Sequence, residues 1–291
     1  MKKFLHVAEA LLVHLVMFIF GSMNFDTASN IGGWLGRAIG PHLKVNKTAR
    51  NNIKMAMPEL SGERVEEILI GMWDNLGRVL TEFAHMKDMD AEKISKICTI
   101  EGQENLDELL KAKGCFLMTG HFGNWEMIPV ITHIKNLPNH IVYRKANNPY
   151  VDKIISKVRS YHCHSSSAKG SVGARQIIKS LHEGKKVLML VDQKQNSGIE
   201  VPFFGRPAMT ASGIANMALK YDCKIFSMKI RRVDGSKFIL TVYPALEITK
   251  TGDEQADILN AMTHINHILE GWIRENPEQW FWVHNRWPKN L

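Results

Sequence analysis

The stretch Cys115-Phe116-Leu117-Met118-Thr119-Gly120-His121-Phe122-Gly123-Asn124-Trp125-Glu126 decides the fold predicted for this chain. Its first five residues form a short apolar run, and a polar turn flanked by glycines follows. This pattern is typical of a buried strand that ends in a functional loop. The next residues, 127–134, are mostly apolar with helical character, so Asn124 is expected to cap a helix that has Glu126 in its first turn. His121 then lies at the carboxyl end of the strand, where open α/β sheets bind ligands.

His121 and Glu126 form a candidate acid–base pair. Residues five apart lie about 140° from each other on a regular helix, so these two meet only if the histidine is in the loop and the glutamate at the helix start. A carboxylate that accepts from one imidazole nitrogen raises the basicity of the other, which then takes a proton from a hydroxyl. The simpler alternative is a histidine at a strand end and a glutamate that stabilises a helix dipole, and spacing alone favours it.

The remainder of the chain alternates short apolar runs with amphipathic stretches. This alternation predicts an α/β fold with a mainly parallel sheet flanked by helices. Further strands are expected at 140–144, 187–191, 224–230 and 238–243, and helices at 125–135, 151–161, 172–181, 211–219 and 253–274. Earlier helices are expected over 28–57, where glycines allow close packing, and over 63–86 after a Ser61 cap. The predicted organisation is a membrane-associated helix over 1–22, a helical region over 23–95 and an α/β core over 96–291.

Positive charge is concentrated in two parts of the sequence. The formal net charge is +8, while residues 141–190 hold ten Lys or Arg against two acids and residues 1–60 hold seven against three. Such a distribution suits a phosphorylated substrate, an acidic carrier protein or an anionic membrane surface. Nucleic acid is disfavoured because the sequence contains no motif that reads it.

The cysteines and the central serines carry weaker signals. The four cysteines are widely spaced, which fits reduced thiols in a cytoplasmic compartment. His162-Cys163-His164 raises a metal alternative, but the spacing is too tight for a structural zinc site and a second ligand pair is missing. Ser165, Ser166, Ser167 and Ser171 do not fit the Gly-x-Ser-x-Gly frame of a hydrolase.

Residues 4–20 are apolar apart from two histidines and Glu9, and they follow the basic pair Lys2-Lys3. This segment is short for a helix that needs about 20 apolar residues to span a bilayer. We expect it to lie in the cytoplasmic leaflet, with the basic region against anionic headgroups. A spanning helix, a signal peptide and a buried core helix are the alternatives.

His121 and Glu126, separated by four residues, resemble the signature of glycerolipid-type acyltransferases. The ordered set of further motifs is similar to the lipid A late acyltransferases, the lauroyl and myristoyl transferases, along nearly the whole chain. The motifs are Arg50-Asn51-Asn52, Pro58-Glu59-Leu60, Tyr143-Arg144, Asn147-Asn148, Lys157-Val158-Arg159, Asp192-Gln193, Pro202-Phe203-Phe204-Gly205, Pro277-Glu278-Gln279-Trp280, Trp282 and Arg286.

The resemblance implies a glycerolipid-acyltransferase-like fold, an inner-membrane location on the cytoplasmic face, and a role in lipopolysaccharide or lipooligosaccharide biosynthesis. It implies that a fatty acyl chain moves from acyl carrier protein to a hydroxyl of a lipid A precursor of the Kdo-modified lipid IVA type, without a cofactor, a metal or an acyl-enzyme. The catalytic residues would be His121 as general base and Glu126 as its orienter. Candidate substrate contacts are Arg144, Arg159, Asp192 and Asn124, although a structural anchoring role for Asp192 is equally consistent with the sequence.

Three alternatives remain from the sequence. They are an acyltransferase for another membrane lipid or glycolipid, a thioesterase, and a non-enzymatic membrane adaptor. Acyl chain length, the hydroxyl acylated and its order of action depend on pocket shape, which the motifs do not encode.

Overall fold

The strand β2 (Cys115–Thr119) lies at the centre of a seven-stranded sheet in the computed structural model, which describes residues 2–287. The strand order is β1-β9-β8-β2-β5-β3-β4. The other strands are β1 (Cys98–Glu101), β3 (Asn139–Tyr143), β4 (Ser165–Ala168), β5 (Lys186–Leu190), β8 (Ile225–Asp234) and β9 (Lys237–Ala245). β2 pairs in parallel with β5 and β8, and β3 pairs in parallel with β4 and β5. The mainly parallel sheet is therefore confirmed.

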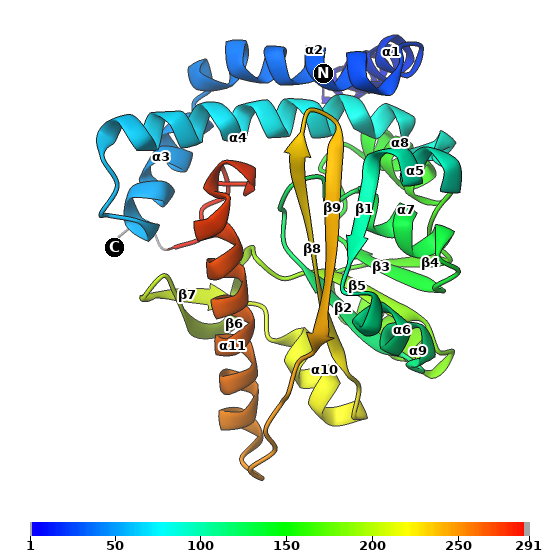
Figure 1. Cartoon of the computed structure of the whole chain (residues 1–291), viewed down its shortest axis with the longest axis vertical. Coiled ribbons are helices and arrows are strands. Elements are labelled where there is room, and N and C mark those ends of the chain that lie inside the picture. Colours follow the sequence, from blue (N-terminus) through cyan, green and yellow to red (C-terminus); the bar gives the residue numbers. More distant parts are fainter. Residues whose placement is uncertain (1, 288–291) are drawn as a thin grey trace.

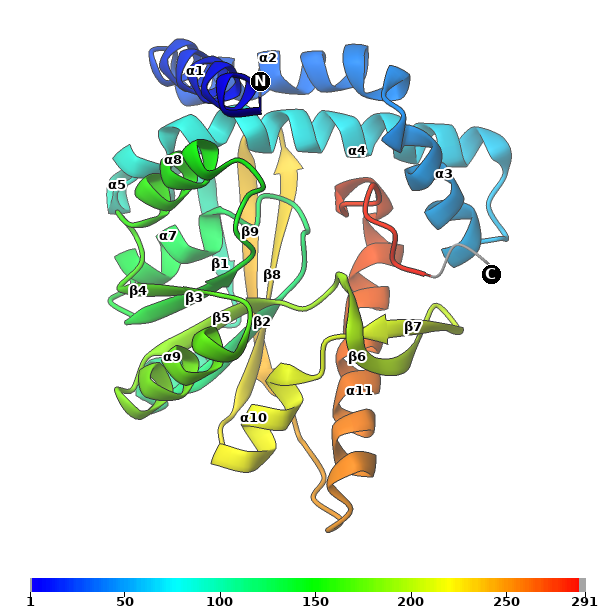
Figure 2. The same ribbon diagram turned by 180° about the vertical axis from the view of Figure 1, so that it is seen from behind.

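Helices cover both faces of this sheet (Figures 1 and 2). They are α5 (Ala91–Ile97), α6 (Gln103–Lys111), α7 (Met127–Ile134), α8 (Pro149–Arg159), α9 (Ser171–His182), α10 (Gly213–Tyr221) and α11 (Glu254–Glu275). Short 3₁₀ turns occur at η1 (Gly40–His42), η2 (Phe83–Asp88) and η3 (Pro277–Gln279). Asn148 caps α8 by accepting from the Tyr150 amide at 2.9 Å, with Pro149 in the first helical turn.

Alternate residues of β2 enter two different cores. Phe116 and Met118 pack with buried residues of α10 and α11, whereas Cys115 and Leu117 pack with buried residues of α6 and α7. Successive side chains of a strand point to opposite faces of the sheet. Because both faces are covered by helices, every residue of β2 is buried and its first four residues are apolar.

The described chain begins with four α-helices, namely α1 (Lys2–Gly21), α2 (Phe25–Ile39), α3 (Val45–Ala56) and α4 (Gly62–Glu82), and α5 then leads into β1. Figure 1 shows α2 lying along α4 above the sheet. The contact requires glycine, because a Cβ atom on Gly36 would lie 2.0 Å from the Trp73 carbonyl oxygen. The predicted Ser61 cap is confirmed, since its side chain accepts from the Arg64 amide at 3.2 Å.

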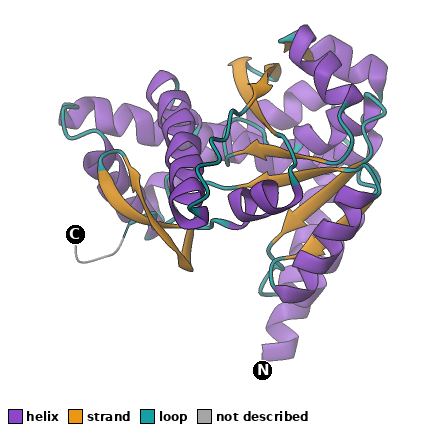
Figure 3. Ribbon diagram, turned by 90° about the horizontal axis from the view of Figure 1, so that it is seen from below, coloured by secondary structure: helices purple, strands orange, loops and turns teal. Residues whose placement is uncertain are grey.

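By length and composition, α1 is able to cross a membrane, and only 11% of its apolar window is buried. Its N-terminal end projects beyond the neighbouring helices in Figure 3.

Buried residues of α3 and α4 belong to the same core as Phe116 and Met118 of the sheet.

Three parts of the fold differ from the sequence-based expectation. The serine run, where no strand was expected, forms β4, and His140 of β3 contacts the Ser165 and Ser167 hydroxyls at 2.8 Å each. β9 reverses direction and pairs antiparallel with β8. The short β1 at the edge of the sheet pairs in parallel with β9. A separate antiparallel pair, β6 (Lys194–Phe203) and β7 (Arg206–Thr210), packs beside α11 (Figure 2).

Candidate active site

The turn after β2 is held in place from several directions. Gly123 has a φ of +54°, and a Cβ atom at this position would lie 2.2 Å from the Ile230 carbonyl oxygen. Its carbonyl accepts from the Asn75 side chain of α4 at 3.0 Å, and its amide donates to the Gln279 carbonyl oxygen at 3.0 Å. Only glycine fits this left-handed, crowded position without strain. The turn therefore presents His121 from a fixed backbone.

Asp192 is the carboxylate that contacts His121. Its Oδ1 lies 2.8 Å from His121 Nδ1, and its Oδ2 accepts from the His121 amide at 2.7 Å. The indole of Trp280 also donates to Oδ2, at 2.8 Å. Asp192 is the second residue after β5. The residue before it, Val191, donates from its amide to the Thr119 carbonyl oxygen at 3.1 Å, so the loops after β2 and β5 lie side by side.

This environment keeps Asp192 ionised. Burial alone would raise the pKa of the carboxyl group, but the charge and hydrogen bonds of His121 and the Trp280 hydrogen bond outweigh burial and lower it to about 2. An ionised carboxylate only accepts hydrogen bonds, so it favours the tautomer of His121 that has its proton on Nδ1. The lone pair of the neutral imidazole is then on Nε2. Nε2 lies 3.3 Å from the Gln193 side chain. In this tautomer Nε2 accepts a hydrogen bond from the Gln193 side-chain amide, which a substrate hydroxyl must displace, so His121 is arranged as a base at the edge of a pocket.

Glu126 does not take the orienting role expected for it. Its carboxylate makes a two-point contact with Arg159 of α8, at 3.0 Å from Nε and 2.5 Å from Nη2. Burial would lower the pKa of Arg159, but the attraction of Glu126 raises it. The physical reason for the correction is that Glu126 lies just before α7 and faces α8, while the position at His121 Nδ1 is occupied by Asp192.

Asn124 is also corrected, because its side chain is fully buried and engaged within the protein. Its amide donates to Glu82 Oε2 of α4 at 2.6 Å, and its oxygen accepts from the Glu126 amide at 3.2 Å. Glu82 is itself buried and pairs with Arg232 of β8. Asn124 therefore positions the turn instead of meeting the substrate. Asp192, expected at the substrate or as an anchor, has its carboxylate committed to His121 and Trp280.

Four basic residues surround a pocket of about 350 Å³ next to His121. They are Arg144, Lys145, Arg159 and Lys169. Arg144, a predicted substrate contact, and Lys145 follow β3 and are exposed. Glu126 is the single acid in the lining within the described part of the chain, and it is paired with Arg159. The pocket thus suits an anionic group beside a basic nitrogen.

The structure gives the serine, histidine and cysteine motifs structural roles. Ser167 bonds to His140 inside the sheet, and His162 is buried with its Nε2 lying 2.6 Å from the Met86 carbonyl oxygen. Within residues 2–287, no group of three or more His, Cys, Asp or Glu side chains is arranged to hold a metal ion. Burial raises the pKa of Cys163, which disfavours a reactive thiolate.

The aromatic clusters pack against one another under the site. Phe203 lies 5.8 Å from Trp280 and 5.7 Å from Trp287, measured between ring centroids. Arg286 is buried beneath them, where it donates to the Met209 carbonyl oxygen at 3.1 Å and to the Thr210 hydroxyl at 2.8 Å. The role that sequence reasoning missed is that of Trp280, whose indole fixes Asp192.

Comparison with known proteins places this geometry in context. Residues 1–289 match the model of a family described as bacterial lipid A biosynthesis acyltransferase. The chain is 24% identical to the lipid A biosynthesis palmitoleoyltransferase of Escherichia coli (strain K12), over 93% of this chain and 88% of the relative. It is 23% identical to the lipid A biosynthesis lauroyltransferase of the same organism, with the same coverage.

A third relative is the lipid A biosynthesis acyltransferase of Haemophilus influenzae (strain ATCC 51907 / DSM 11121 / KW20 / Rd), which is 25% identical over 87% of this chain and 81% of the relative. Among solved structures, the 1-acyl-sn-glycerophosphate acyltransferase PlsC of Thermotoga maritima aligns with a TM-score of 0.40 and 11% identity, over 84% of this chain and 99% of that one. That likeness is too distant to assign residues.

Proposed function

Because the chain belongs to the bacterial lipid A biosynthesis acyltransferase family, we propose that it moves a fatty acyl chain from acyl carrier protein to a hydroxyl of a Kdo-modified lipid A precursor. The chain is an acyltransferase that acts in lipid A biosynthesis. What we propose beyond the family membership is the identity of the acyl donor, the identity of the acceptor and the residues that perform the chemistry.

His121 performs the proton transfer in this proposal. Its Nε2 removes the proton from the acceptor hydroxyl while the hydroxyl oxygen attacks the thioester carbonyl carbon. The carbon–sulfur bond then breaks, and the leaving thiolate takes the proton from His121. The products are an ester on the lipid and a free thiol on the carrier. Asp192 holds Nδ1 throughout and stabilises the charged imidazolium, which supports a general-base contribution of about 10² to 10⁴ in rate.

Arg159 holds a negatively charged group of the substrate or the developing oxyanion. Its Nε and Nη2 each donate one hydrogen bond to Glu126, which leaves the Nη1 hydrogens and one Nη2 hydrogen for the pocket. Glu126 therefore acts as a positioning residue for Arg159. Arg144, Lys145 and Lys169 extend the positive rim, which suits precursor phosphates and an acidic carrier.

The N-terminal helix supports membrane association at the cytoplasmic face of the inner membrane. Phe4, Leu12 and Leu15 of α1 are 76%, 60% and 53% exposed, far more than a helix of a protein core. A carrier protein delivers its acyl chain from the cytoplasm, so the active site is expected on that side.

The observation that carries the proposal is the contact of Asp192 with His121 Nδ1 beside a basic pocket. The test incubates the purified chain with acyl carrier protein loaded with a single fatty acid and with the purified Kdo-modified precursor. Mass spectrometry of the lipid is expected to detect one added acyl chain, and His121→Ala is expected to abolish it.

A reaction without the acceptor is the matched control. The transferase proposal predicts that the thioester then survives, whereas release of free fatty acid at an equal rate identifies a thioesterase. Transfer to a glycerophosphate lipid in preference to the Kdo-modified precursor would refute the acceptor while retaining the chemistry.

A further inference from the structure

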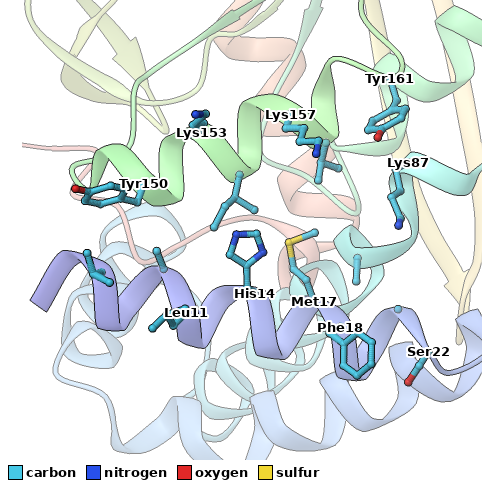
Figure 4. Close-up of a pocket in the computed structure, with 16 residues that line it drawn as sticks. Leu11, His14, Met17, Phe18, Ser22, Lys87, Tyr150, Lys153, Lys157 and Tyr161 are labelled. Atoms are coloured by element: carbon cyan, nitrogen blue, oxygen red, sulfur yellow. The ribbon is translucent and has the colours of Figure 1, made fainter. Parts of the chain in front are cut away.

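A second cavity of about 820 Å³ lies between α1 and α8, away from His121 (Figure 4). Val7, Ala10 and Met17 of α1 contribute to one wall, and Ile154 and Val158 of α8 contribute to the other. The lining from Val7 to Ser22 covers about 22 Å of helix axis, at 1.5 Å per residue. That length exceeds the depth of hydrocarbon in one leaflet, which is about 15 Å.

Specific polar contacts fix the two walls relative to each other. Asn148, which caps α8, donates from its side-chain amide to the His6 carbonyl oxygen and to Glu9 Oε2 of α1, each at 2.8 Å. The nearby Asp152 accepts from the Ala146 amide at 2.7 Å. Glu9 and Asp152, the single acids of α1 and α8, are therefore engaged outside the cavity, while Asp88 lies 3.8 Å from the ammonium of Lys87.

The cavity combines an apolar wall with a cationic rim. Lys87, Lys153 and Lys157 line it, and its lining within the described residues contains no Asp or Glu. In Figure 4, Lys87 and Tyr161 lie at one end and Tyr150 at the other. Tyrosines at helix ends beside lysines are typical of a membrane interface, where the ring meets chains and the hydroxyl meets headgroups.

The cavity is separate from the active-site pocket. The two share no lining residue, because Arg159 of α8 contacts Glu126 whereas Lys153, Ile154 and Lys157 of the same helix line the cavity. A molecule bound between α1 and α8 is thus not in position to react at His121.

We propose that this cavity, the α1–α8 groove, binds one acyl chain of an anionic glycerophospholipid of the surrounding bilayer, with its phosphate at Lys153 and Lys157. The exposed apolar face of α1 continues from the groove, so a bilayer lipid enters sideways without leaving the hydrocarbon. The rim charge selects an anionic headgroup.

The test is native mass spectrometry of the delipidated full chain in detergent, titrated with phosphatidylglycerol or phosphatidylcholine of identical chains. The wild type is expected to bind one phosphatidylglycerol at least tenfold more tightly than phosphatidylcholine. The double variant Lys153→Gln, Lys157→Gln is expected to bind phosphatidylglycerol about 30-fold more weakly. Each lysine near an anionic lipid contributes slightly more than about fivefold to the affinity. Lys179→Gln with Lys220→Gln removes the same charge from exposed sites outside the groove and is expected to change nothing.

The apolar wall has its own matched pair of variants. Val7 lines the groove and Val16 does not, yet both are on α1 and both are 38% exposed. Val7→Asn is expected to lower the affinity for both lipids at least fivefold, and Val16→Asn is expected to leave both affinities unchanged. Circular dichroism and thermal unfolding confirm that each variant is folded.

Three outcomes would overturn the proposal. They are equal binding of the two lipids, equal loss in the two lysine double variants, and equal loss in the two valine variants. His121→Ala is expected to bind phosphatidylglycerol like the wild type, so failure of acyl transfer and failure of the lipid site are distinguishable. A loss of lipid binding in His121→Ala would contradict the separation of the two sites.

Discussion

Replacing Asp192 with asparagine removes the charge beside His121 while keeping the size of the side chain. The pKa of Asp192 falls from 3.8 to about 2 despite burial, which corresponds to about 2 to 3 kcal/mol of preference for the ionised form. The ionised carboxylate beside Nδ1 stabilises the imidazolium that forms during transfer, and each 1.36 kcal/mol of lost stabilisation is about tenfold in rate. Loss of the charge alone is therefore expected to reduce kcat roughly 10²-fold.

A second effect adds to this loss. Asparagine presents an amide NH₂ as readily as an oxygen, so His121 can adopt the tautomer that has its proton on Nε2. A comparable substitution in a serine protease triad costs about 10⁴ in kcat. The expected range for Asp192→Asn is thus a 10² to 10⁴-fold decrease in kcat, with KM for the acyl donor little changed.

The assay measures initial rates of ester formation under saturating acyl carrier thioester and precursor. His121→Ala sets the background rate, and circular dichroism verifies the fold. A rate within threefold of the wild type in Asp192→Asn, with His121→Ala inactive, would refute the role of Asp192.

Acid unfolding provides an independent check on the same carboxylate. Because its pKa in the folded state is below the ordinary 3.8, Asp192 contributes stability above about pH 4 that is lost as the pH falls toward about 2. The free energy of unfolding of the wild type should fall by about 2 to 3 kcal/mol more than that of Asp192→Asn over this window. Urea titrations at several pH values measure it, and parallel pH profiles of the two proteins would contradict the assignment.

Three other substitutions test the neighbouring contacts. Arg159→Lys is expected to lower kcat/KM at least tenfold, because an ammonium group lacks the planar set of donors that binds Glu126 and the substrate together. An unchanged kcat/KM would show that Arg159 does not bind the substrate. Glu82→Gln should lower the free energy of unfolding by about 3 to 5 kcal/mol, since it leaves a buried guanidinium unpaired, and a loss below 1 kcal/mol in chemical denaturation would contradict this. Ser167→Ala should retain full acyl transfer and lose about 1 kcal/mol of stability, whereas an inactive but folded variant would indicate a serine nucleophile.

The central strand–turn–helix unit was predictable because local patterns determine it. β2 begins and ends where the apolar run does, and α7 begins at Met127, two residues after the predicted start. The serines of β4 gave no strand signal, because their pairing depends on hydrogen bonds to His140 of the neighbouring strand. The antiparallel pairing of β9 was missed although the sequence marks it, because Asp234-Gly235 lies at the tight turn between β8 and β9 and Asp-Gly is a hairpin signal.

The site was predicted in part. The sequence identified both His121 and Asp192 as site candidates, but it assigned the orienting carboxylate to Glu126, the nearer residue in sequence. Asp192 lies 71 positions away, and only the pairing of β2 with β5 brings it to the histidine. A local motif does not encode which of two nearby acids the loop faces.

The buried network beneath the turn had one sequence signal. Glu82 interrupts the apolar face of α4, and a carboxylate at such a position requires partners, which the structure supplies as Asn124 and Arg232. Neither partner is close in sequence, so the acid was detectable but its contacts were not. The role of Trp280 was hidden for the same reason, because an indole in an aromatic-rich segment is usually a packing residue.

Mass spectrometry of lipid A tests the central claim most directly. Cells that lack the chain are complemented with the wild type or with His121→Ala, at equal protein levels in the membrane fraction. The account predicts one additional acyl chain on lipid A with the wild type and none with His121→Ala, and the mass increment gives the chain length. Identical lipid A in both cultures, with or without the additional chain, would contradict it.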